Sequence, residues 1–356
     1  MAYTDIDDPS VHFQTLTYTG NGANDRALVN DGNSDLQPDW IWFKERNSTS
    51  VHQVLDSSRG VNKALSPNDN GADETYAYLS SFDSNGFTFD QSDGSTNENT
   101  NTFVAWQWKA NGGTTASNTD GDITSTVQAN TTAGFNIVTY TGNGSGSTQT
   151  VGHGLGGQAD LIIVKNRSEA ASWRVLCSAT STGNLFLDDT ASLDTENPAA
   201  INSANASTFT LHEFGTNNGV NKGSNTYVAY CFKNIQGYSK IGSYIGNGTG
   251  ANTAADGTFV YTGFKPAWVM AKATTVAQGW NMFDNTRTPT NEMGAFLYAN
   301  NANAETTGYD SMDFLSNGFK LRKNLNGAND SGQTYIYMAF AEHPFVSSKG
   351  VPTTAR

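Results

Sequence analysis

Histidines and carboxylates are the side chains in this sequence that could do acid–base or metal chemistry. His153 stands out because it lies in VGHGLGG (151–157), where the glycines would let the backbone approach a ligand or adopt unusual dihedral angles. The simpler interpretation is a turn in which the imidazole forms local hydrogen bonds. No H-x3-H or C-x2-C spacing of a metal site is present, so we expect no metal centre at the histidines. The other histidines are His12, His52, His212 and His343.

Two acid–base pairs recur at the same spacing. Asp56 precedes Arg59 by three residues, and Asp284 precedes Arg287 in the same way. Because the middle of the chain lacks the pair, we interpret both as structural ion pairs at strand ends. A glycosidase would need a second carboxylate at roughly 5–10 Å, and no candidate stands out. No nucleophile elbow, P-loop or dinucleotide fingerprint is present either, so we expect no enzymatic activity.

The chain repeats one order of sequence blocks three times. YTGNG (18–22) returns as YTGNG (140–144) and YIGNG (244–248). The apolar runs that follow are QPDWIWFKER (37–46), QADLIIVKNR (158–167) and KPAWVMAKAT (265–274). The closing blocks are NTFVAWQWKA (101–110), NTYVAYCFKN (225–234) and QTYIYMAFAE (333–342). Because order and spacing recur, we interpret the chain as three copies of one domain.

Period-two patterns and turn signals predict short strands in every copy. The closing blocks alternate apolar and aromatic residues, which is typical of strands. SNGF (84–87 and 316–319) carries Asn-Gly, the signal of a tight hairpin turn. Runs that are apolar on both faces, such as DLIIVK, indicate central strands covered on both sides. We therefore predict an all-β protein of three tandem antiparallel β-sandwich domains, with a jelly-roll variant equally compatible.

The repeat sets the expected domain boundaries. We place the copies at 11–110, 133–236 and 237–345, with an N-terminal attachment segment at 1–10 and a C-terminal tail at 346–356. Residues 111–132 are rich in Gly, Thr, Ser and Asn and are expected to form an exposed polar linker. Copies two and three are joined by only a short segment with apolar residues. We therefore expect these two copies to pack together and copy one to be hinged.

Tryptophans could stack on the apolar faces of sugar rings. Most occupy matching positions in different copies, as Trp40 and Trp268 do, and matching positions favour core packing. Trp42 and Trp108 have no tryptophan at their counterparts. They are therefore the better ligand candidates, together with His153.

Acidic clusters and cysteines complete the candidate sites. DIDD (5–8), NDNGADE (68–74) and the acidic pair at 188–189 could hold Ca²⁺, although a solvated acidic surface is the simpler interpretation. We expect no other cofactor. Cys177 and Cys231 lie in strand-like apolar runs and are interpreted as two buried thiols. Two cysteines in 356 residues cannot form a disulfide framework.

Composition excludes several classes of function. The net charge is −13, so the chain would repel phosphate backbones, and nucleic-acid binding is not expected. No run of 18 apolar residues is present, and we expect no membrane insertion. The first ten residues are acidic and do not resemble a secretory signal.

Four long segments of the sequence resemble those of a known family. They are VGHGLGGQADLIIVKNRS (151–168), YVAYCFKNIQGYSKIGSYIGNG (227–248), FVYTGFKPAWVMAK (259–272) and GQTYIYMAFAEHPF (332–345). Through these segments, most of residues 11–345 resembles a repeated domain found in tail-fibre and other virion structural proteins of marine and cyanobacterial phages. The resemblance implies a lectin-like sandwich on a virion surface and assigns no binding residues. Copy one departs from it, because LVNDGNSD (28–35) replaces VGHGLGG.

The sequence therefore leads us to expect a non-enzymatic virion protein, located on the tail or capsid surface. We expect a tail-fibre or tail-tip adhesin that contacts host surface glycans, with other virion proteins as partners and a homo-oligomeric state. The alternative is a capsid decoration or fibre subunit with a purely structural role. An adhesin should present an exposed aromatic or polar pocket, whereas a decoration protein should present a flat hydrophobic docking face.

Overall fold

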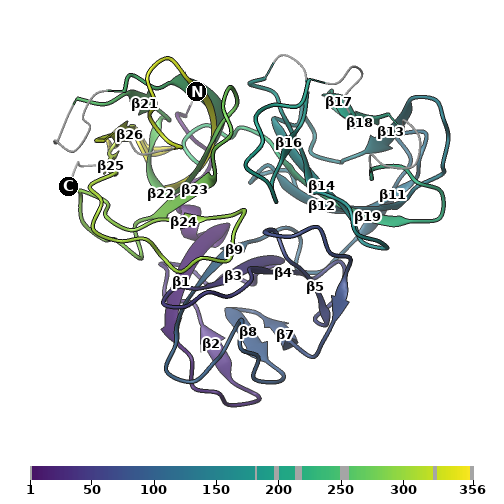
Figure 1. Ribbon diagram of the computed structural model, residues 1–356, viewed down its shortest axis with the longest axis horizontal. Coiled ribbons are helices and arrows are strands. Elements are labelled where there is room, and N and C mark those ends of the chain that lie inside the picture. The colour runs from purple at the N-terminus through teal and green to yellow at the C-terminus, as the bar shows by residue number, and fades with distance from the viewer. Residues whose placement is uncertain are drawn as a thin grey trace.

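The computed structural model describes residues 2–180, 183–195, 200–212, 219–248, 256–323 and 327–352. The described chain is all-β, as the sequence predicts, and its only helix is the 3-10 helix η1 (Pro9–Val11). Three lobes lie around a common centre, and both ends of the described chain lie at the third lobe (Figure 1). Each lobe combines one large antiparallel sheet with one three-stranded antiparallel sheet.

The first lobe is built by copy one. Its large sheet has the order β1 (Phe13–Thr19), β9 (Thr102–Trp108), β3 (Trp40–Glu45), β4 (Gln53–Asp56), β5 (Lys63–Leu65) and β6 (Glu74–Thr75). Its small sheet has the order β2 (Ala27–Val29), β8 (Gly86–Phe89) and β7 (Leu79–Asp83).

The second lobe has the largest sheet. The strand order is β10 (Ala116–Asn118), β11 (Ser125–Asn130), β12 (Phe135–Thr141), β19 (Thr226–Phe232), β14 (Leu161–Asn166), β15 (Arg174–Cys177) and β16 (Leu185–Phe186). The small sheet has the order β13 (Gln149–Gly152), β18 (Thr208–Leu211) and β17 (Ile201–Ala204).

The third lobe repeats the arrangement without the two extra strands at the edge. Its large sheet has the order β20 (Ser239–Ile245), β27 (Thr334–Pro344), β22 (Phe264–Ala273), β23 (Trp280–Asp284) and β24 (Leu297–Tyr298). Its small sheet has the order β21 (Phe259–Tyr261), β26 (Gly318–Leu321) and β25 (Met312–Leu315).

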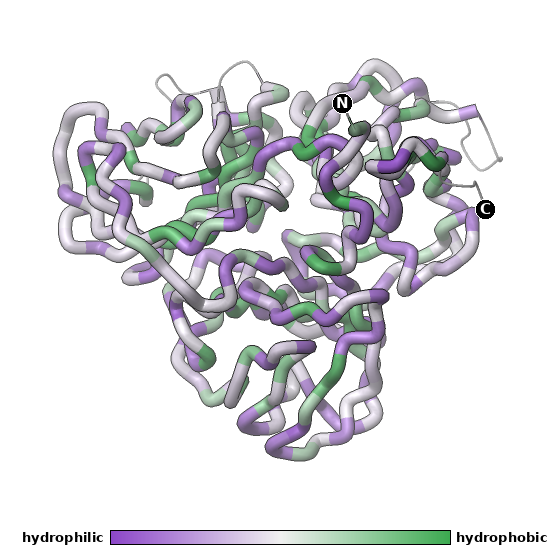
Figure 2. The backbone as a smooth tube through the Cα atoms, turned by 180° about the vertical axis from the view of Figure 1, so that it is seen from behind, coloured by the Kyte–Doolittle hydropathy of each residue, from purple (hydrophilic) through white to green (hydrophobic). Residues whose placement is uncertain are grey.

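The central strands of each large sheet are apolar on both faces because each face is buried against a different layer. On β3, Ile41 and Phe43 pack in a core that copy one forms with its own small sheet. Trp40 and Trp42 alternate with them and point to the centre of the molecule. Copies two and three have equivalent cores of their own. Hydrophobic stretches accordingly lie inside the lobes, and the loops at the rim are mostly hydrophilic (Figure 2).

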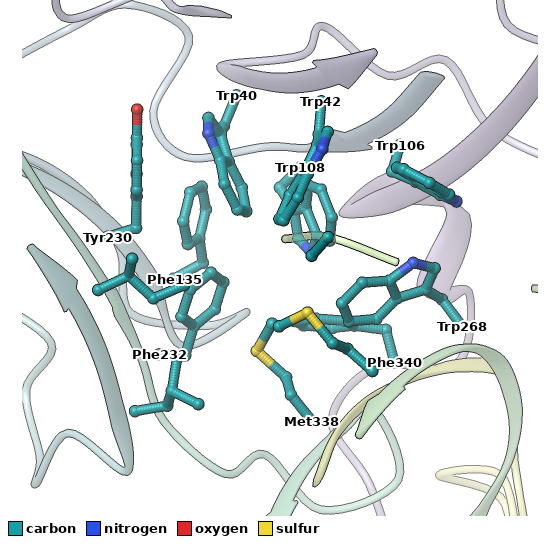
Figure 3. Packing of buried hydrophobic residues seen from close by; sticks show 14 of the residues in the cluster. Trp40, Trp42, Trp106, Trp108, Phe135, Tyr230, Phe232, Trp268, Met338 and Phe340 are labelled. Atoms are coloured by element: carbon teal, nitrogen blue, oxygen red, sulfur yellow. The ribbon is translucent and has the colours of Figure 1, made fainter. Parts of the chain in front are cut away.

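A single aromatic core at the centre joins all three copies (Figure 3). Ring contacts link every pair of copies. The ring centroids lie 4.5 Å apart for Trp40 and Tyr230, 6.0 Å for Phe232 and Phe340, and 5.6 Å for Trp108 and Trp268. Such offset and edge-to-face aromatic pairs add to the free energy gained from burial. The three sandwiches therefore share one core.

The shared core corrects the expectation that copy one is hinged. Copy one contributes four of the seven tryptophans in this core, so it is part of the same packed centre as the other copies. The expected linker at 111–132 is also wrong in its central part, because it contains β10 and β11, which extend the sheet of copy two. The polar sequence concealed these strands because β10 is largely exposed and β11 buries mainly one face.

The N-terminal residues pack against the third lobe. The Tyr3 hydroxyl donates to the carbonyl oxygen of Gly263 at 2.7 Å, and the Thr4 hydroxyl donates to that of Gln236 at 2.8 Å. The backbone N–H of Ser348 donates to Asp7 at 2.6 Å. Residues 2–10, the described part of the expected attachment segment 1–10, thus connect copy one to copy three and to the C-terminal segment. Attachment to a particle through them stays a prediction.

One buried lysine from each copy reaches a loop of its neighbour. Lys44, Lys165 and Lys272 occupy matching positions and are fully buried, and burial lowers the pKa of each to about 8. Their ammonium groups donate to carbonyl oxygens of the neighbouring copy. These acceptors are Ala302 for Lys44 at 3.2 Å, Asn70 for Lys165 at 3.1 Å, and Thr190 and Ala191 for Lys272 at 3.2 and 2.8 Å. The contact repeats around the ring, so the three copies form a closed cycle.

Beside each of these lysines, a ring nitrogen of the same copy also forms a hydrogen bond to a carbonyl oxygen of the neighbouring copy. The indole N–H of Trp173 donates to the Ser66 carbonyl oxygen, and that of Trp280 donates to the Phe186 carbonyl oxygen. His52 takes this position in copy one. Its Nδ1 accepts from Trp42 at 2.8 Å, so its Nε2 carries the proton and donates to Asn301 at 3.1 Å.

Both predicted ion pairs are present and fully buried at interfaces between copies. Arg59 lies 2.5 Å from Asp56, which also accepts from the Tyr230 hydroxyl of copy two. Arg59 bonds Asp73 as well, and Asp73 pairs with Arg167 of copy two. The interface between copies three and one repeats this cluster with Asp284, Arg287, Glu305, Arg46 and the indole N–H of Trp106.

The interface between copies two and three replaces the whole cluster with apolar or uncharged residues. Leu193 of copy two matches Asp73 of copy one, because both donate the same backbone hydrogen bond across the interface. The N–H of Asp73 donates to the carbonyl oxygen of Arg167, and the N–H of Leu193 donates to that of Thr274. The replaced positions are Cys177, Thr180, Leu193, Thr274 and Met338. The acidic residues, the arginines and the hydrogen-bond donor of the cluster are all replaced together by uncharged residues. No buried charge is therefore left without a partner at these positions of the interface.

Replacing only the arginine of a buried ion cluster should lower the free energy of unfolding more than replacing the arginine together with its aspartate. Arg59→Thr leaves the buried Asp56 carboxylate uncompensated, and we expect the free energy of unfolding to fall by about 3–5 kcal/mol. Asp56→Cys with Arg59→Thr copies the residues of copy two and should be less destabilised than Arg59→Thr alone. Urea unfolding of both variants measures this. A double variant that is less stable than the single one would contradict the explanation.

Acid should destabilise the fold through its buried histidines. Burial, followed by the nearby Lys44, lowers the pKa of His52 to about 3, and burial lowers that of His12 to about 4. Unfolded histidine takes up a proton below about pH 6.5 whereas the folded group stays neutral, so stability is lost as the pH falls from 6.5 towards 3.

His52→Gln should remove the share of this dependence that His52 contributes, roughly 2–3 kcal/mol between pH 7 and 4.5. Denaturant titrations of the wild type and the variant across this range would show it. His343→Gln, at a partly exposed side chain, is the matched control. Parallel pH profiles of wild type and His52→Gln would refute the prediction.

Candidate functional site

Trp42 and Trp108, the predicted sugar-stacking residues, are fully buried in the central core. Trp42 donates its indole N–H to His52, and Trp108 lies 4.9 Å from Phe13 between ring centroids. Neither side chain can contact a ligand from solution. Trp42 and Trp108 were singled out because the other copies have no tryptophan at the matching positions. That difference reflects packing, since three sheets of different sequence need side chains of different size to fill the central core.

His153, the third predicted ligand residue, is also fully buried. Its Nδ1 accepts from the backbone N–H of Leu155 at 3.2 Å, and Nε2 lies 3.1 Å from the carbonyl oxygen of Asn205. Burial lowers the pKa of the imidazole. These contacts are those of a local turn, which is the simpler interpretation of VGHGLGG.

The acidic clusters bond to protein groups. Asp8 accepts from Ser10 and Ser34, and Asp69 accepts from the backbone N–H of Gly71 at 2.7 Å. Burial raises the pKa of Asp188 to about 6. Within the described parts of the chain, no three His, Cys, Asp or Glu side chains are placed to hold a metal ion. The clusters therefore give no support to a Ca²⁺ site.

The two cysteines are free and buried. Burial raises the pKa of the Cys177 thiol to about 12, and it raises that of Cys231 as well. Buried thiols with raised pKa values are poor nucleophiles.

The outer face of the third lobe carries an aromatic pair that is open to solvent. On β21, Phe259 and Tyr261 are 44% and 55% exposed, while Val260 between them is buried in the core of copy three. Alternate residues of a strand share a face, so the two rings lie side by side at a spacing of about 6.6 Å along the strand. We call this surface the β21 face.

Its neighbours give the β21 face a polar border and a fixed shape. Lys320 pairs with Phe259 across the sheet, and its ammonium group contacts Asp256. Gly318 pairs with Tyr261 and leaves that ring uncovered. The hydroxyl of Tyr3 lies 3.4 Å from that of Tyr261, so the N-terminal residues hold this tyrosine from the side.

The aromatic pair belongs to copy three alone. Leu28 of copy one matches Val260, because Leu28 pairs with Phe87 as Val260 pairs with Phe319. The residues of copy one that match Phe259 and Tyr261 are therefore Ala27 and Val29. In copy two the matching residues are Thr150 and Gly152. In the sequence the pair belongs to FVY (259–261), an alternating run that indicates a strand but does not show which of its faces is exposed.

A family model described as Domain of unknown function (DUF7483) matches residues 8–344. The chain belongs to this family. The match covers all three lobes, so the DUF7483 unit includes the complete cycle of three copies and the strands at 116–130. No curated protein and no solved structure matches the chain. Among the described residues, no helix has the length and apolar character to cross a membrane.

The buried position of Trp108 leads to a test by substitution. Its counterparts are Phe232 and Phe340, so Trp108→Phe should lower the free energy of unfolding by less than about 2 kcal/mol. Trp108→Ala should cost about 3–5 kcal/mol because it opens a cavity beside Phe13 and Trp268. Thermal unfolding measures both. An Ala variant as stable as the Phe variant would show that the site is not a packed core.

Proposed function

We propose that this DUF7483 protein is a non-enzymatic virion component that acts as an adhesin and contacts host surface glycans through the β21 face. The virion setting rests on the sequence resemblance to phage structural proteins. The observation that carries the glycan contact is the exposed pair Phe259 and Tyr261, present in one copy only. A selective role explains this better than packing, since the other copies fold without the pair.

The chemistry of the β21 face suits a sugar. Aromatic rings stack on the apolar C–H faces of pyranoses, and exposure of both rings leaves these contacts available. Lys320 and Asp256 at the border offer a donor and acceptors for sugar hydroxyls. The Tyr3 contact orders Tyr261 before binding, which reduces the entropy lost on association.

A single aromatic pair makes a weak contact, so adhesion would depend on many chains per particle. Linked or clustered sites raise the overall affinity without new contacts. The alternative function, a structural decoration or fibre subunit, would use the same face to dock onto another virion protein. The expected homo-oligomer stays a prediction, because the structure is that of a single chain.

Binding of the intact protein to an array of bacterial surface glycans tests the proposal. The double variant Phe259→Ala/Tyr261→Ala should bind its glycan at least tenfold more weakly, because aromatic anchors dominate small contact surfaces. Val29→Ala, at the matching exposed position of copy one, is the control and should bind like the wild type.

Both rings are exposed, so the double variant should unfold at the wild-type temperature. Equal binding by the wild type and the double variant would overturn the proposal. A protein that binds no glycan, but pulls down purified virion proteins only while its aromatic pair is intact, would establish the structural alternative.

A further inference from the structure

A hollow of about 350 Å³ opens where copy one meets copy three. Its floor includes Phe13 and Thr15 of β1, and its walls include Asn285, Thr286 and Glu342 of copy three. A second hollow of about 300 Å³ adjoins it and shares Asn285. We call the first the β1 hollow, because it runs beside the outer strand of the copy-one sheet.

The corresponding place between copies one and two is filled by the chain itself. There β11 pairs with β12 and sets Gln128 opposite Ile137, the residue that matches Thr15. The Gln128 amide is fully buried and makes four hydrogen bonds of 2.8–3.1 Å with copy one and the residues after it. Two go to the hydroxyls of Ser57 and Ser58, which match Asn285 and Thr286.

An amide also occupies the corresponding place between copies two and three. Asn234 accepts from the backbone N–H of Ile241 at 2.5 Å and donates to the Ile241 carbonyl oxygen at 3.4 Å. Ile241 is the β20 residue that matches Thr15. Two of the three interfaces thus place a primary amide beside the outer strand.

The third interface lacks this amide. Glu342 stands at the position of Asn234, and its carboxylate is bound to Lys265 at 2.5 Å and Asn285 at 2.8 Å. The Thr15 hydroxyl is nine-tenths buried and has no hydrogen-bond partner within the described chain. β1 pairs with β9 only, so every second residue of β1 turns its backbone N–H and C=O away from the sheet.

We propose that the β1 hollow receives an extended strand of a partner protein, which pairs with the free edge of β1 and places a Gln or Asn side chain beside Thr15. The internal strand β11 is the template for this mode of strand addition. Asp31, Glu342 and His343 line the hollow, and Glu342 is already paired with Lys265. An acidic side chain that entered would be repelled by the Asp31 carboxylate, so an amide like that of Gln128 fits better than a carboxylate.

The chain supplies its own probe for this site. A capped, fluorescent peptide with the sequence of residues 123–132 (ITSTVQANTT) carries the template glutamine, and its anisotropy with the full-length protein reports binding. We expect saturable binding, weakened at least tenfold when the peptide carries Gln128→Glu and about three- to tenfold when it carries Gln128→Leu.

Protein variants locate the site. Thr286→Trp should block the hollow and abolish binding, and Thr15→Val should weaken binding about three- to tenfold without lowering the unfolding temperature. Val29→Trp, on an exposed strand elsewhere in copy one, should bind like the wild type. Phe259→Ala/Tyr261→Ala should also leave peptide binding unchanged, so this proposal and that of glycan binding fail separately.

Hydrogen exchange decides between the possible strand edges. Peptide binding should slow amide exchange in β1 (Phe13–Thr19). Protection of β20 or of β12, the latter by displacement of β11, would overturn the proposal, and so would a peptide that fails to bind at about 1 mM. A peptide that binds equally well with Glu in place of Gln would overturn the assigned amide.

Discussion

The shared aromatic core is the constraint on which the rest of the structure depends. Each large sheet has two apolar faces, and its own small sheet covers only one of them. The second face must therefore be buried against the other two copies. This requirement explains why three sandwiches that could in principle fold alone form one unit, and why tryptophans gather at the centre.

Once the copies share a core, their contacts must hold a fixed order around it. The three buried lysines provide a repeated contact because each ammonium group needs carbonyl acceptors that only a neighbouring loop supplies. Two interfaces carry equivalent ion clusters, and the third carries uncharged residues in their place. Replacement of a whole cluster between copies two and three shows that the residues of one interface behave as a set.

Much of the fold could be predicted from the sequence, but less of the site. Block repetition revealed three copies, and alternation revealed strands such as β3 and β9 with apolar residues on both faces. The meaning of the second apolar face was missed, because periodicity shows that a face is buried and does not show what covers it. Trp42 and Trp108 were therefore taken as ligand candidates although they face the centre. Phe259 and Tyr261 were overlooked because only the structure shows which face of β21 is exposed.

Departures from the threefold repeat indicate where the copies have different roles. Positions that match in all copies, such as the lysines, are accounted for by closure of the ring. Three features do not match: the inserted strands of copy two, the aromatic pair of copy three and the open hollow beside β1. None of them is needed to bury the common core, since at least one other copy does without each. The inserted strands fill the interface between copies one and two, and the aromatic pair and the open hollow are the two features that our proposals assign to contacts with other molecules.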